Sequence, residues 1–380
     1  MTVDRLVASP EAEALLDLTR DLADKELRPR AADDEAAHVF PRDVFTTVGR
    51  AGLLGLPYEE RYGGGGQPYE VYLQVVEELA AAWLAVGLGV SVHTLSCFPV
   101  AAFGSDEQKD RWLPDMLGGE QLGAYSLSEP SSGSDAAALT TRAVRDGNQF
   151  VVTGTKAWVT HGGEADYYNL MCRTGDDGPK GISCLLVPAG AQGLHVQPPE
   201  RKMGMRSSPT AALSFDGARV DADRLVGAEG EGFRIAMGAL EGGRLGIAAC
   251  GVGLAQAALD YAVGYARERR QFGRSITEFQ GVSFLLADMA TAIEGARQLY
   301  LYGARLRDAG HPYGTVAAMA KLAATDTAMR VATDAVQVLG GAGYVEDHPV
   351  ERYLREAKVL QIVEGTNQVQ RMVIGRSLAS

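Results

Sequence analysis

The sequence predicts an α+β protein that is mainly helical, with a helical N-terminal domain, a β-barrel-like middle domain and a C-terminal four-helix bundle. Residues up to about 122 are rich in Ala, Leu and Glu at helical spacing, and this character returns after about 231. The residues between form short β-type runs with Gly, Pro and Asp at the breaks. No low-complexity linker separates the blocks, so we expect three closely packed domains over 1–122, 123–230 and 231–380.

The N-terminal block is predicted to be a set of amphipathic and buried helices. EAEALLDLTRDLADKEL, 11–27, spaces its leucines along one helix face, and Pro41 opens another helix. PYEERYGGGGQP, 57–68, is predicted to be a loop. EVYLQVVEELAAAWLAVGLGVSVHTL, 70–95, is long and mostly apolar, which predicts a single buried helix.

The middle and C-terminal blocks differ in periodicity. GNQFVVTGTKAWVT, 147–160, indicates two short strands around turn residues, and the runs after it predict an antiparallel sheet or barrel. After 231, three long Ala-rich runs repeat an apolar face, and the third ends at Gly340 and Gly341, which stop the helix. With two shorter helices after them, these runs predict the four-helix bundle.

Composition excludes several classes of protein. Lysine and arginine number 36 against 48 aspartates and glutamates, and this net charge of −12 disfavours a broad nucleic-acid-binding surface. No apolar run reaches the ~18 residues of a membrane span, and the acidic residues near the start disfavour a targeting peptide. The four cysteines show no CxxC spacing and HExxH is absent, so neither a metal site nor a disulfide framework is indicated. We therefore expect a cytoplasmic enzyme without integral membrane association.

Two glycine motifs suggest phosphate binding, but local structure explains both better. GGGG at 63–66 lacks the Gly-Lys-Ser/Thr of a phosphate loop and follows no clear strand, so we predict a turn. GVG at 251–253 begins a GxGxxG pattern, but Gln256 occupies the third glycine position inside a helical run. This favours helix packing and excludes a Rossmann site.

The run YSLSEPSSGSD, 125–135, is the first candidate site. Its Ser, Pro and Gly residues force irregular backbone with free N–H and hydroxyl donors, which suits a polar ring or a phosphate, although an ordinary Ser-rich turn has the same composition. KAWVTHGG follows, with Trp158 and Thr160 two residues apart and hence on one face of a strand. A Trp beside a hydroxyl suits a flat conjugated ring, and a core Trp is the alternative.

The run ARERRQFGRSI, 266–276, is the second candidate. Arginine forks match phosphate oxygens and Phe272 can stack on a base, whereas a solvated basic helix end is the equally weighted alternative. The arginines of this run are Arg267, Arg269, Arg270 and Arg274.

The run QIVEGTNQ, 361–368, is the third candidate. It predicts a helix that ends at Gly365, a bend, and a new helix capped by Thr366 or Asn367. Glu364 would then lie at a helix C-terminus in apolar surroundings, and both factors raise the pKa of its carboxyl group. Such a carboxylate suits a general base, although a lone Glu is more often a surface residue.

Taken together, these residues resemble the acyl-CoA dehydrogenase family along nearly the whole chain. YSLSEPSSGSD is similar to the family's first signature, and RRQFGRSITEFQ, QVLGGAGYVEDHPVERYLREAK, IVEGT and QVQR are similar to its second region. The resemblance implies the same three domains, bound FAD, and a homotetramer built as a dimer of dimers. It also implies electron transfer to a separate electron-transfer flavoprotein.

The resemblance implies roles for individual residues. Glu364 matches the catalytic base. Positions that contact FAD, some of them on a neighbouring subunit, are matched by Tyr125, Leu127, Ser128, Gly133, Ser134, Trp158, Val159, Thr160, Arg269, Gln271, Phe272, Gln280, Gln337, Gly340, Gly341, Thr366 and Gln368. Positions that bind the substrate are matched by Ser134, Glu241, Arg244 and Gly365, and Glu241 stands where the family usually has Asp.

The implied reaction is FAD-dependent α,β-dehydrogenation of an acyl-CoA thioester to the trans-2-enoyl-CoA. Glu364 would take the α-proton while the β-hydrogen leaves as hydride to FAD, and hydrogen bonds to the thioester oxygen would stabilise the developing enolate. One alternative is a dehydrogenase of an acyl group held by an acyl carrier protein in secondary metabolism. Another is a flavin-binding protein without dehydrogenase activity.

The acyl group is expected to be short. Some relatives carry their base at the position of Gly243, where this chain has no side chain, and the free volume beside the α and β carbons suits a methyl branch. VSVHTLSCFPVAAFGSDEQK, 90–109, also resembles short- and branched-chain members. We therefore expect butyryl-, isobutyryl- or 2-methylbutyryl-CoA to be preferred over palmitoyl-CoA, in fatty acid or branched-chain amino acid catabolism.

Overall fold

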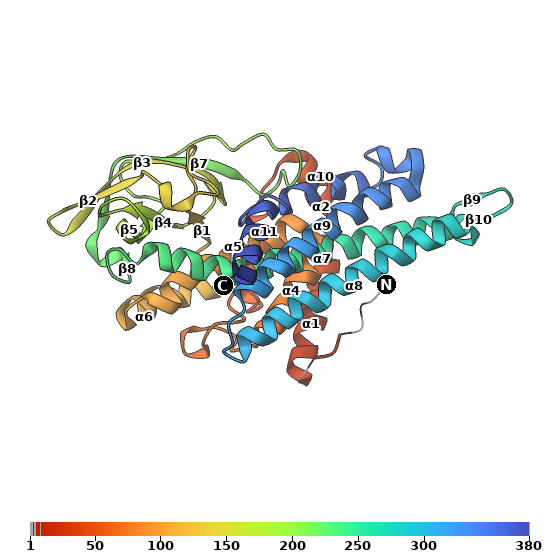
Figure 1. Ribbon diagram of the computed structural model, residues 1–380, viewed down its shortest axis with the longest axis horizontal. Coiled ribbons are helices and arrows are strands. Elements are labelled where there is room, and N and C mark those ends of the chain that lie inside the picture. The colour runs from red at the N-terminus through yellow and green to blue at the C-terminus, as the bar shows by residue number, and fades with distance from the viewer. Residues whose placement is uncertain (1–2, 4, 8, 380) are drawn as a thin grey trace.

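The computed structural model describes residues 3, 5–7 and 9–379. As predicted, it combines helices, a middle sheet and further long helices (Figure 1). The sheet lies at one end of the molecule, and the hairpin of β9 (Arg270–Gln271) and β10 (Arg274–Ser275) extends from the opposite end. The long helices connect these two ends.

The N-terminal helices run up to the first strand. Ser9 caps the first of them by accepting a hydrogen bond from the Ala12 N–H at 3.1 Å. A one-turn π-helix at Ala23–Leu27 and a 3₁₀ turn at Glu60–Tyr62 join some of the helices. The helices are α1 (Pro10–Leu22), α2 (Ala31–Ala37), α3 (Arg42–Arg50), α4 (Tyr69–Ala82), α5 (Leu84–Phe103) and α6 (Asp106–Gly118).

The middle sheet has eight strands in the order β6-β7-β3-β2-β4-β5-β8, and β1 also pairs with β4. Most pairs are antiparallel as predicted, but β1 and β2 each run parallel to β4, so the sheet is mixed. Short 3₁₀ turns lie at Ala136–Ala138, Pro179–Gly181 and Ala222–Arg224. The strands are β1 (Gly123–Ser126), β2 (Arg142–Asp146), β3 (Gln149–Thr160), β4 (Tyr167–Arg173), β5 (Ile182–Pro188), β6 (Leu194–Val196), β7 (Thr210–Asp221) and β8 (Leu225–Val226).

The prediction of two short strands over 147–160 was wrong, because β3 is a single strand of 12 residues. The residues taken for a turn form bulges instead, and the pairing with β7 shifts register at Val152/Gly154 and at Lys156/Val159. Gly154 has φ +145°, which a bulge accommodates without ending the strand. The long strand carries Trp158 and Thr160 to the end of the sheet.

The C-terminal region contains the longest helices, and they form the predicted bundle. Gly340 ends one of them with φ +61°, as expected for a helix stop. A 3₁₀ turn at Ile276–Glu278 follows the β9–β10 hairpin, and another, η7, spans Gly340–Tyr344. The helices are α7 (Gly232–Glu268), α8 (Gln280–Asp308), α9 (Gly314–Leu339), α10 (Val350–Leu360) and α11 (Asn367–Ala379).

The prediction of one helix over 70–95 was also wrong. Trp83 adopts extended backbone angles, φ −157° and ψ 107°, and divides the run into α4 and α5. The Trp83 indole N–H donates to Glu35 Oε1 at 3.3 Å, and the side chain is buried. The break lets the two helices pack closely, since a Cβ at Gly87 would lie only 2.6 Å from Ala80. Apolar periodicity does not reveal such a break, because both helices are buried on most sides.

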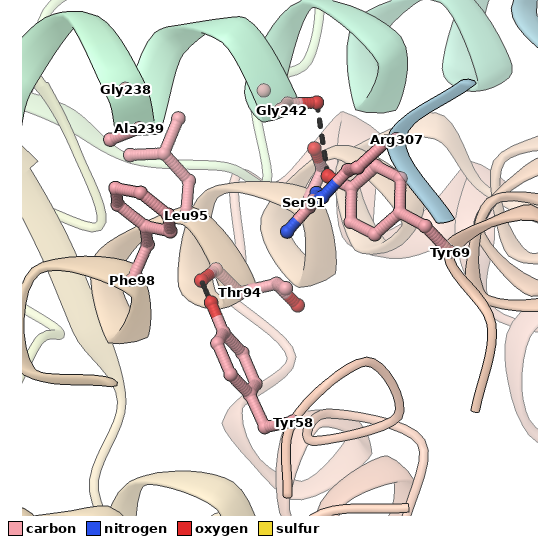
Figure 2. Close-up of a pocket in the computed structure, with 11 residues that line it drawn as sticks. Tyr58, Tyr69, Ser91, Thr94, Leu95, Phe98, Gly238, Ala239, Gly242 and Arg307 are labelled. Carbon is pink, nitrogen blue, oxygen red and sulfur yellow. Dashed lines mark hydrogen bonds between the residues drawn. The ribbon is translucent and has the colours of Figure 1, made fainter. Parts of the chain in front are cut away.

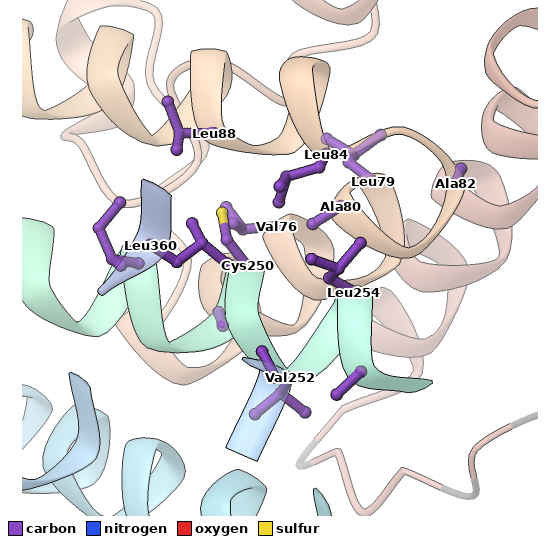
Figure 3. Packing of buried hydrophobic residues seen from close by; sticks show 14 of the residues in the cluster. Val76, Leu79, Ala80, Ala82, Leu84, Leu88, Cys250, Val252, Leu254 and Leu360 are labelled. Carbon is purple, nitrogen blue, oxygen red and sulfur yellow. The ribbon is translucent and has the colours of Figure 1, made fainter. Parts of the chain in front are cut away.

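The main core lies between α4, α5, α7 and the C-terminal helices, where aliphatic side chains interdigitate (Figure 3). The GVG run packs here as predicted: a Cβ at Gly253 would lie 2.3 Å from the Glu77 carbonyl oxygen, and one at Gly251 would lie 3.3 Å from that of Ala324. By length and composition α5 and α7 could each cross a membrane, but 89% and 78% of their most apolar segments are buried inside the protein. Core helices have this property.

Candidate functional site

Glu364 lies in the turn between α10 and α11 with a left-handed backbone, φ +54°, followed by Gly365 at φ +89°. Thr366 caps the next helix, as predicted, by accepting a hydrogen bond from the Val369 N–H at 3.3 Å. Both Glu364 carboxylate oxygens are buried and lack a hydrogen-bond partner among the described residues. Burial raises the pKa of Glu364 to about 7, against the opposing effect of the nearby cations Arg244 and Lys321. The predicted rise in the pKa agrees with this direction, but the predicted helix end at Gly365 was wrong: α10 (Val350–Leu360) ends at Leu360, so burial rather than a helix C-terminus raises the pKa.

Gly243 in α7 faces the Glu364 carboxylate directly. A Cβ at position 243 would lie 2.1 Å from Glu364 Oε2 and 2.5 Å from Leu95 Cδ1, so no side chain fits there without displacing the carboxylate. The neighbouring Arg244 is buried, and its Nε has no hydrogen-bond partner among the described residues. Gly243 and Leu95 also line a pocket between α4, α5, α7 and α8 (Figure 2). Glu364 therefore lies against the wall of this pocket.

Lys321 in α9 holds the turn that carries Glu364, a role that no motif around the lysine indicated. Its fully buried ammonium donates to the Gly365 carbonyl oxygen at 3.0 Å and to Asn367 Oδ1 at 2.8 Å. The Gln370 amide also donates to the Gly365 carbonyl oxygen, at 2.8 Å. These bonds stabilise two consecutive left-handed residues, a conformation that is costly for Glu364. Only the tertiary contact of α9 with this turn reveals the lysine.

We expect Lys321→Met to move the pH dependence of proton abstraction by Glu364 to higher pH. Lys321 lowers the pKa of Glu364, so loss of the ammonium should raise that pKa above about 7. A carboxylate acts as a base only when deprotonated, so, with Glu364 as the predicted base, the low-pH limb of flavin bleaching by substrate should shift to higher pH, as stopped-flow measurements would show. Lys321→Arg keeps the charge and serves as the control. An unshifted limb in Lys321→Met would rule out the electrostatic role.

The Ser-rich loop after β1 is fastened to β3 by a buried ion pair that the sequence did not indicate. Lys156 Nζ donates to Glu129 Oε1 at 2.9 Å and to the Leu127 carbonyl oxygen at 2.8 Å, and both charged side chains are almost completely buried. The Glu129 carboxylate also accepts hydrogen bonds from the backbone N–H groups of Thr140 and Thr141, each at 2.8 Å. The conformation of this loop is therefore fixed by buried polar contacts, unlike that of an ordinary surface turn. The same contacts hold the loop beside β3, the strand that carries Trp158.

The residues around Trp158 fit a flat, polar cofactor such as a flavin. Trp158 is 65% exposed with φ +62°, although Lys156 and Val159 beside it are buried. The hydroxyls of Tyr125 and Ser126 in β1 are buried without hydrogen-bond partners among the described residues. Burial raises the pKa of Tyr125 well above its usual value, and the Glu364 carboxylate adds to the rise, so β1 lies near the candidate base.

The structure divides the predicted site residues into two groups. The first belongs to the sheet end of the molecule, to α7 and to the turn before α11: Tyr125, Leu127, Ser128, Gly133, Ser134, Trp158, Val159, Thr160, Glu241, Arg244, Glu364, Gly365, Thr366 and Gln368. The second belongs to the β9–β10 hairpin, the start of α8 and the end of α9: Arg269, Gln271, Phe272, Gln280, Gln337, Gly340 and Gly341. Phe272 is 94% exposed at the tip of the hairpin. Within one chain the hairpin lies at the opposite end of the molecule from β3, the strand that contains Trp158 (Figure 1).

Comparison with known proteins covers nearly the whole chain. The N-terminal, middle and C-terminal domain models of the acyl-CoA dehydrogenase family match residues 9–120, 124–218 and 230–379. The chain is 45% identical over 363 residues to an acyl-CoA dehydrogenase of Bacillus subtilis, covering 95% of this chain and 96% of the relative. It is 42% identical over 366 residues to the short-chain specific acyl-CoA dehydrogenase of Clostridium acetobutylicum, covering 96% and 97%.

Solved structures also match the chain over nearly its whole length. The butyryl-CoA dehydrogenase of Megasphaera elsdenii superposes with a TM-score of 0.97 at 38% identity, over 99% of this chain and 100% of that one. A chain in a structure of the electron transferring flavoprotein of Acidaminococcus fermentans superposes with a TM-score of 0.97 at 42% identity, over 99% of both chains. With Glu364 buried against a pocket beside a flavin-compatible loop, this protein belongs to the acyl-CoA dehydrogenase family of flavin-dependent oxidoreductases.

Proposed function

We propose that the protein catalyses FAD-dependent α,β-dehydrogenation of a short acyl-CoA to the trans-2-enoyl-CoA, with Glu364 as the base. The observation that carries this proposal is the buried, unpaired Glu364 carboxylate against Gly243 at the wall of the pocket. Electrons would pass to an electron-transfer flavoprotein in the cytoplasm. The short-chain specific and butyryl-CoA relatives support a substrate of this size.

The residues of this chain provide three things for the reaction. The Glu364 carboxylate, with its pKa near 7, is ready to accept a proton from carbon at neutral pH. The turn at Gly365, fastened by Lys321, keeps that carboxylate aimed at the pocket. Leu95 and Phe98 form an apolar part of the pocket wall, which would limit the access of water to a bound substrate. FAD bound beside Trp158 would supply the two-electron acceptor for the hydride that leaves the β-carbon.

The acyl group is proposed to be a short straight or α-methyl-branched chain. The free volume that the sequence predicted beside Gly243 is absent, because a Cβ there would lie 2.1 Å from Glu364 Oε2 and 2.5 Å from Leu95 Cδ1. The absence of a side chain at Gly243 still leaves the Glu364 carboxylate in place, and the bulky residues Phe98, Tyr58 and Tyr69 that line the pocket favour a short chain. Each buried methylene contributes about 0.8 kcal/mol, so affinity rises with each methylene that the pocket buries, and methylenes left outside it add nothing. Palmitoyl-CoA should therefore be a poor substrate.

One experiment tests the proposed function as a whole. The purified protein should be yellow, with one FAD per chain, and butyryl-, isobutyryl- or 2-methylbutyryl-CoA should bleach the flavin far faster than palmitoyl-CoA. A panel of acyl-CoAs from four to sixteen carbons, assayed with an electron-accepting dye, gives the preference directly. A protein that stays colourless when given FAD would refute the proposal, and a preference for palmitoyl-CoA would refute its substrate part.

The second group of predicted FAD contacts is proposed to act on a neighbouring subunit of a homotetramer. Arg269 and Phe272 are exposed on a hairpin at the end of the molecule opposite the sheet (Figure 1), so they are free to reach another chain. An arginine that bridges to the FAD pyrophosphate of that chain would form charge-assisted hydrogen bonds.

We expect Arg269→Ala to weaken FAD binding and the tetramer together, because the same guanidinium would contribute to both. Loss of such a contact costs roughly 1.5–3 kcal/mol. Flavin absorbance and size-exclusion chromatography on a dilution series measure the two effects in parallel. Arg267→Ala, in the last turn of α7, is the matched control for a general loss of positive charge. Full FAD occupancy of the Arg269→Ala variant on dilution would refute the bridging role.

A further inference from the structure

Arg307, in the last turn of α8, lines the same pocket as Gly243 (Figure 2). A Cβ at Gly242 would lie 3.0 Å from Arg307 Nη1 and 3.0 Å from the Tyr69 hydroxyl. Gly242 therefore faces Arg307 just as the next residue, Gly243, faces the Glu364 carboxylate. The candidate base and the Arg307 guanidinium thus lie at two different parts of the pocket wall. The residues of α7 that face them, Gly243 and Gly242, are adjacent in the helix.

The Arg307 guanidinium has no carboxylate partner among the described residues, where every ion pair that forms involves other side chains. Its neighbours are aromatic instead: it lies 3.5 Å from the centre of the Tyr69 ring and 5.9 Å from that of Tyr313. Burial raises the pKa of Tyr69 to about 12. Tyr69 is therefore neutral at physiological pH and does not cancel the positive charge.

Two carboxylates near this end of α8, Asp308 and Glu70, are already engaged elsewhere. Asp308 accepts hydrogen bonds from the backbone N–H groups of Tyr69 and Glu70, at 2.8 and 3.2 Å, and so caps α4. The Glu70 carboxylate pairs with Arg305 at 2.6 Å. A largely enclosed cation with no carboxylate partner is unusual in a folded protein, because burying a charge is costly unless it is paired.

A second polar group in the pocket also lacks a partner. Ser91 in α5 is 2% exposed, and its hydroxyl makes no hydrogen bond with any described residue. A Cβ at Gly246, one turn beyond Gly242 in α7, would lie 2.1 Å from Ser91 Oγ, so the hydroxyl lies against the same side of the helix. Ser91, Arg307 and Tyr69 all line this pocket (Figure 2). An alkyl chain would leave both groups unsatisfied.

We infer that this pocket accepts a short acyl chain that ends in a carboxylate, with Arg307 binding the terminal carboxylate and Ser91 donating a hydrogen bond to it. This inference rests on the proposed function and specifies its substrate class: the CoA monothioester of a dicarboxylic acid with four or five carbons. The arginine supplies the fork geometry that carboxylates bind best. The dehydrogenation itself is unchanged, because the terminal carboxylate takes no part in breaking the α and β C–H bonds.

The test compares two thioesters of equal length, glutaryl-CoA and pentanoyl-CoA, which differ in the terminal carboxylate. In the unmodified holoenzyme we expect kcat/KM for flavin bleaching to favour glutaryl-CoA by at least tenfold. In Arg307→Met this ratio should reverse, and in Arg307→Lys it should lie between the two. A variant that is only less stable lowers both rates and leaves the ratio in place, so folding defects do not mimic the result.

Arg305→Met is the matched control, since Arg305 lies on the same helix and is half exposed and paired with Glu70 outside the pocket. It should keep the ratio of the unmodified enzyme. A holoenzyme that prefers pentanoyl-CoA, with a ratio that Arg307→Met does not change, would overturn the inference. If neither thioester bleaches the flavin, the proposed function is wrong. In that case the dissociation constants of glutaryl-CoA and pentanoyl-CoA, measured from the change in flavin absorbance on binding, still show whether Arg307 binds the carboxylate.

Discussion

Glu364→Gln is expected to retain FAD and to bind substrate, but to lose at least about 10²–10⁴-fold in turnover. Glutamine has nearly the same shape as glutamate, so the turn held by Lys321 and Gln370 should remain. Its amide, however, cannot accept the α-proton. Anaerobic stopped-flow measurement of flavin bleaching isolates this step from the later transfer of electrons. Near-normal bleaching in the variant would show that another group is the base.

The same substitution should make the protein more stable at high pH, which provides an independent check. The pKa of Glu364 rises from 4.5 to about 7 on folding, so the stability present below pH 4.5 is lost as the pH rises through 7. The loss amounts to about 3 kcal/mol for a shift of this size, and the uncharged amide of the variant would not incur it. The Tm difference between the variant and the unmodified protein should therefore be larger at pH 8 than at pH 5. An equal difference at both pH values would mean that Glu364 is not buried as a carboxylate.

The double change Gly243→Glu with Glu364→Gly is expected to recover part of the turnover that Glu364→Gly loses. The geometry supports this exchange, because a Cβ at position 243 would lie 2.1 Å from the place of Glu364 Oε2. Removal of the Glu364 side chain frees the volume that a glutamate at 243 requires. Its carboxylate would then approach the same α-carbon from α7 instead of from the α10–α11 turn. Flavin bleaching by butyryl-CoA in the single and double variants measures the recovery.

Gly243→Glu alone provides the complementary control. With Glu364 in place, the new side chain would clash with that carboxylate and with Leu95, and two carboxylates would share one buried site. We therefore expect this single variant to be less active than the double variant. If the double variant shows no activity beyond that of Glu364→Gly, the two positions do not address the same carbon.

Local sequence patterns account for the element types and for the candidate base. Apolar periodicity predicted helices, then a sheet, then a helical bundle, and turn residues predicted the ends at Gly340 and the new helix at Thr366. The direction of the Glu364 pKa shift was predicted, but its cause is tertiary: Ile362 near it in the chain is half exposed, and the carboxylate is buried against Gly243 of α7. The break at Trp83 and the unbroken β3 were missed, because both depend on which partner each segment pairs with.

The sequence by itself determined the family and the order of the domains, and it proposed Glu364 as the base, since these follow from motifs and from spacing along the chain. Only the tertiary structure decided what surrounds them. Lys321 reaches the Gly365 carbonyl oxygen from 44 positions away in the chain, and Lys156 pairs with Glu129 across two segments. Arg307 joins the pocket only because α8 returns to α4 and α7. The cost of burying a charge depends on whether it has a partner of opposite charge. Packing between segments distant in the chain decides which partners are present, so local sequence pattern does not reveal them.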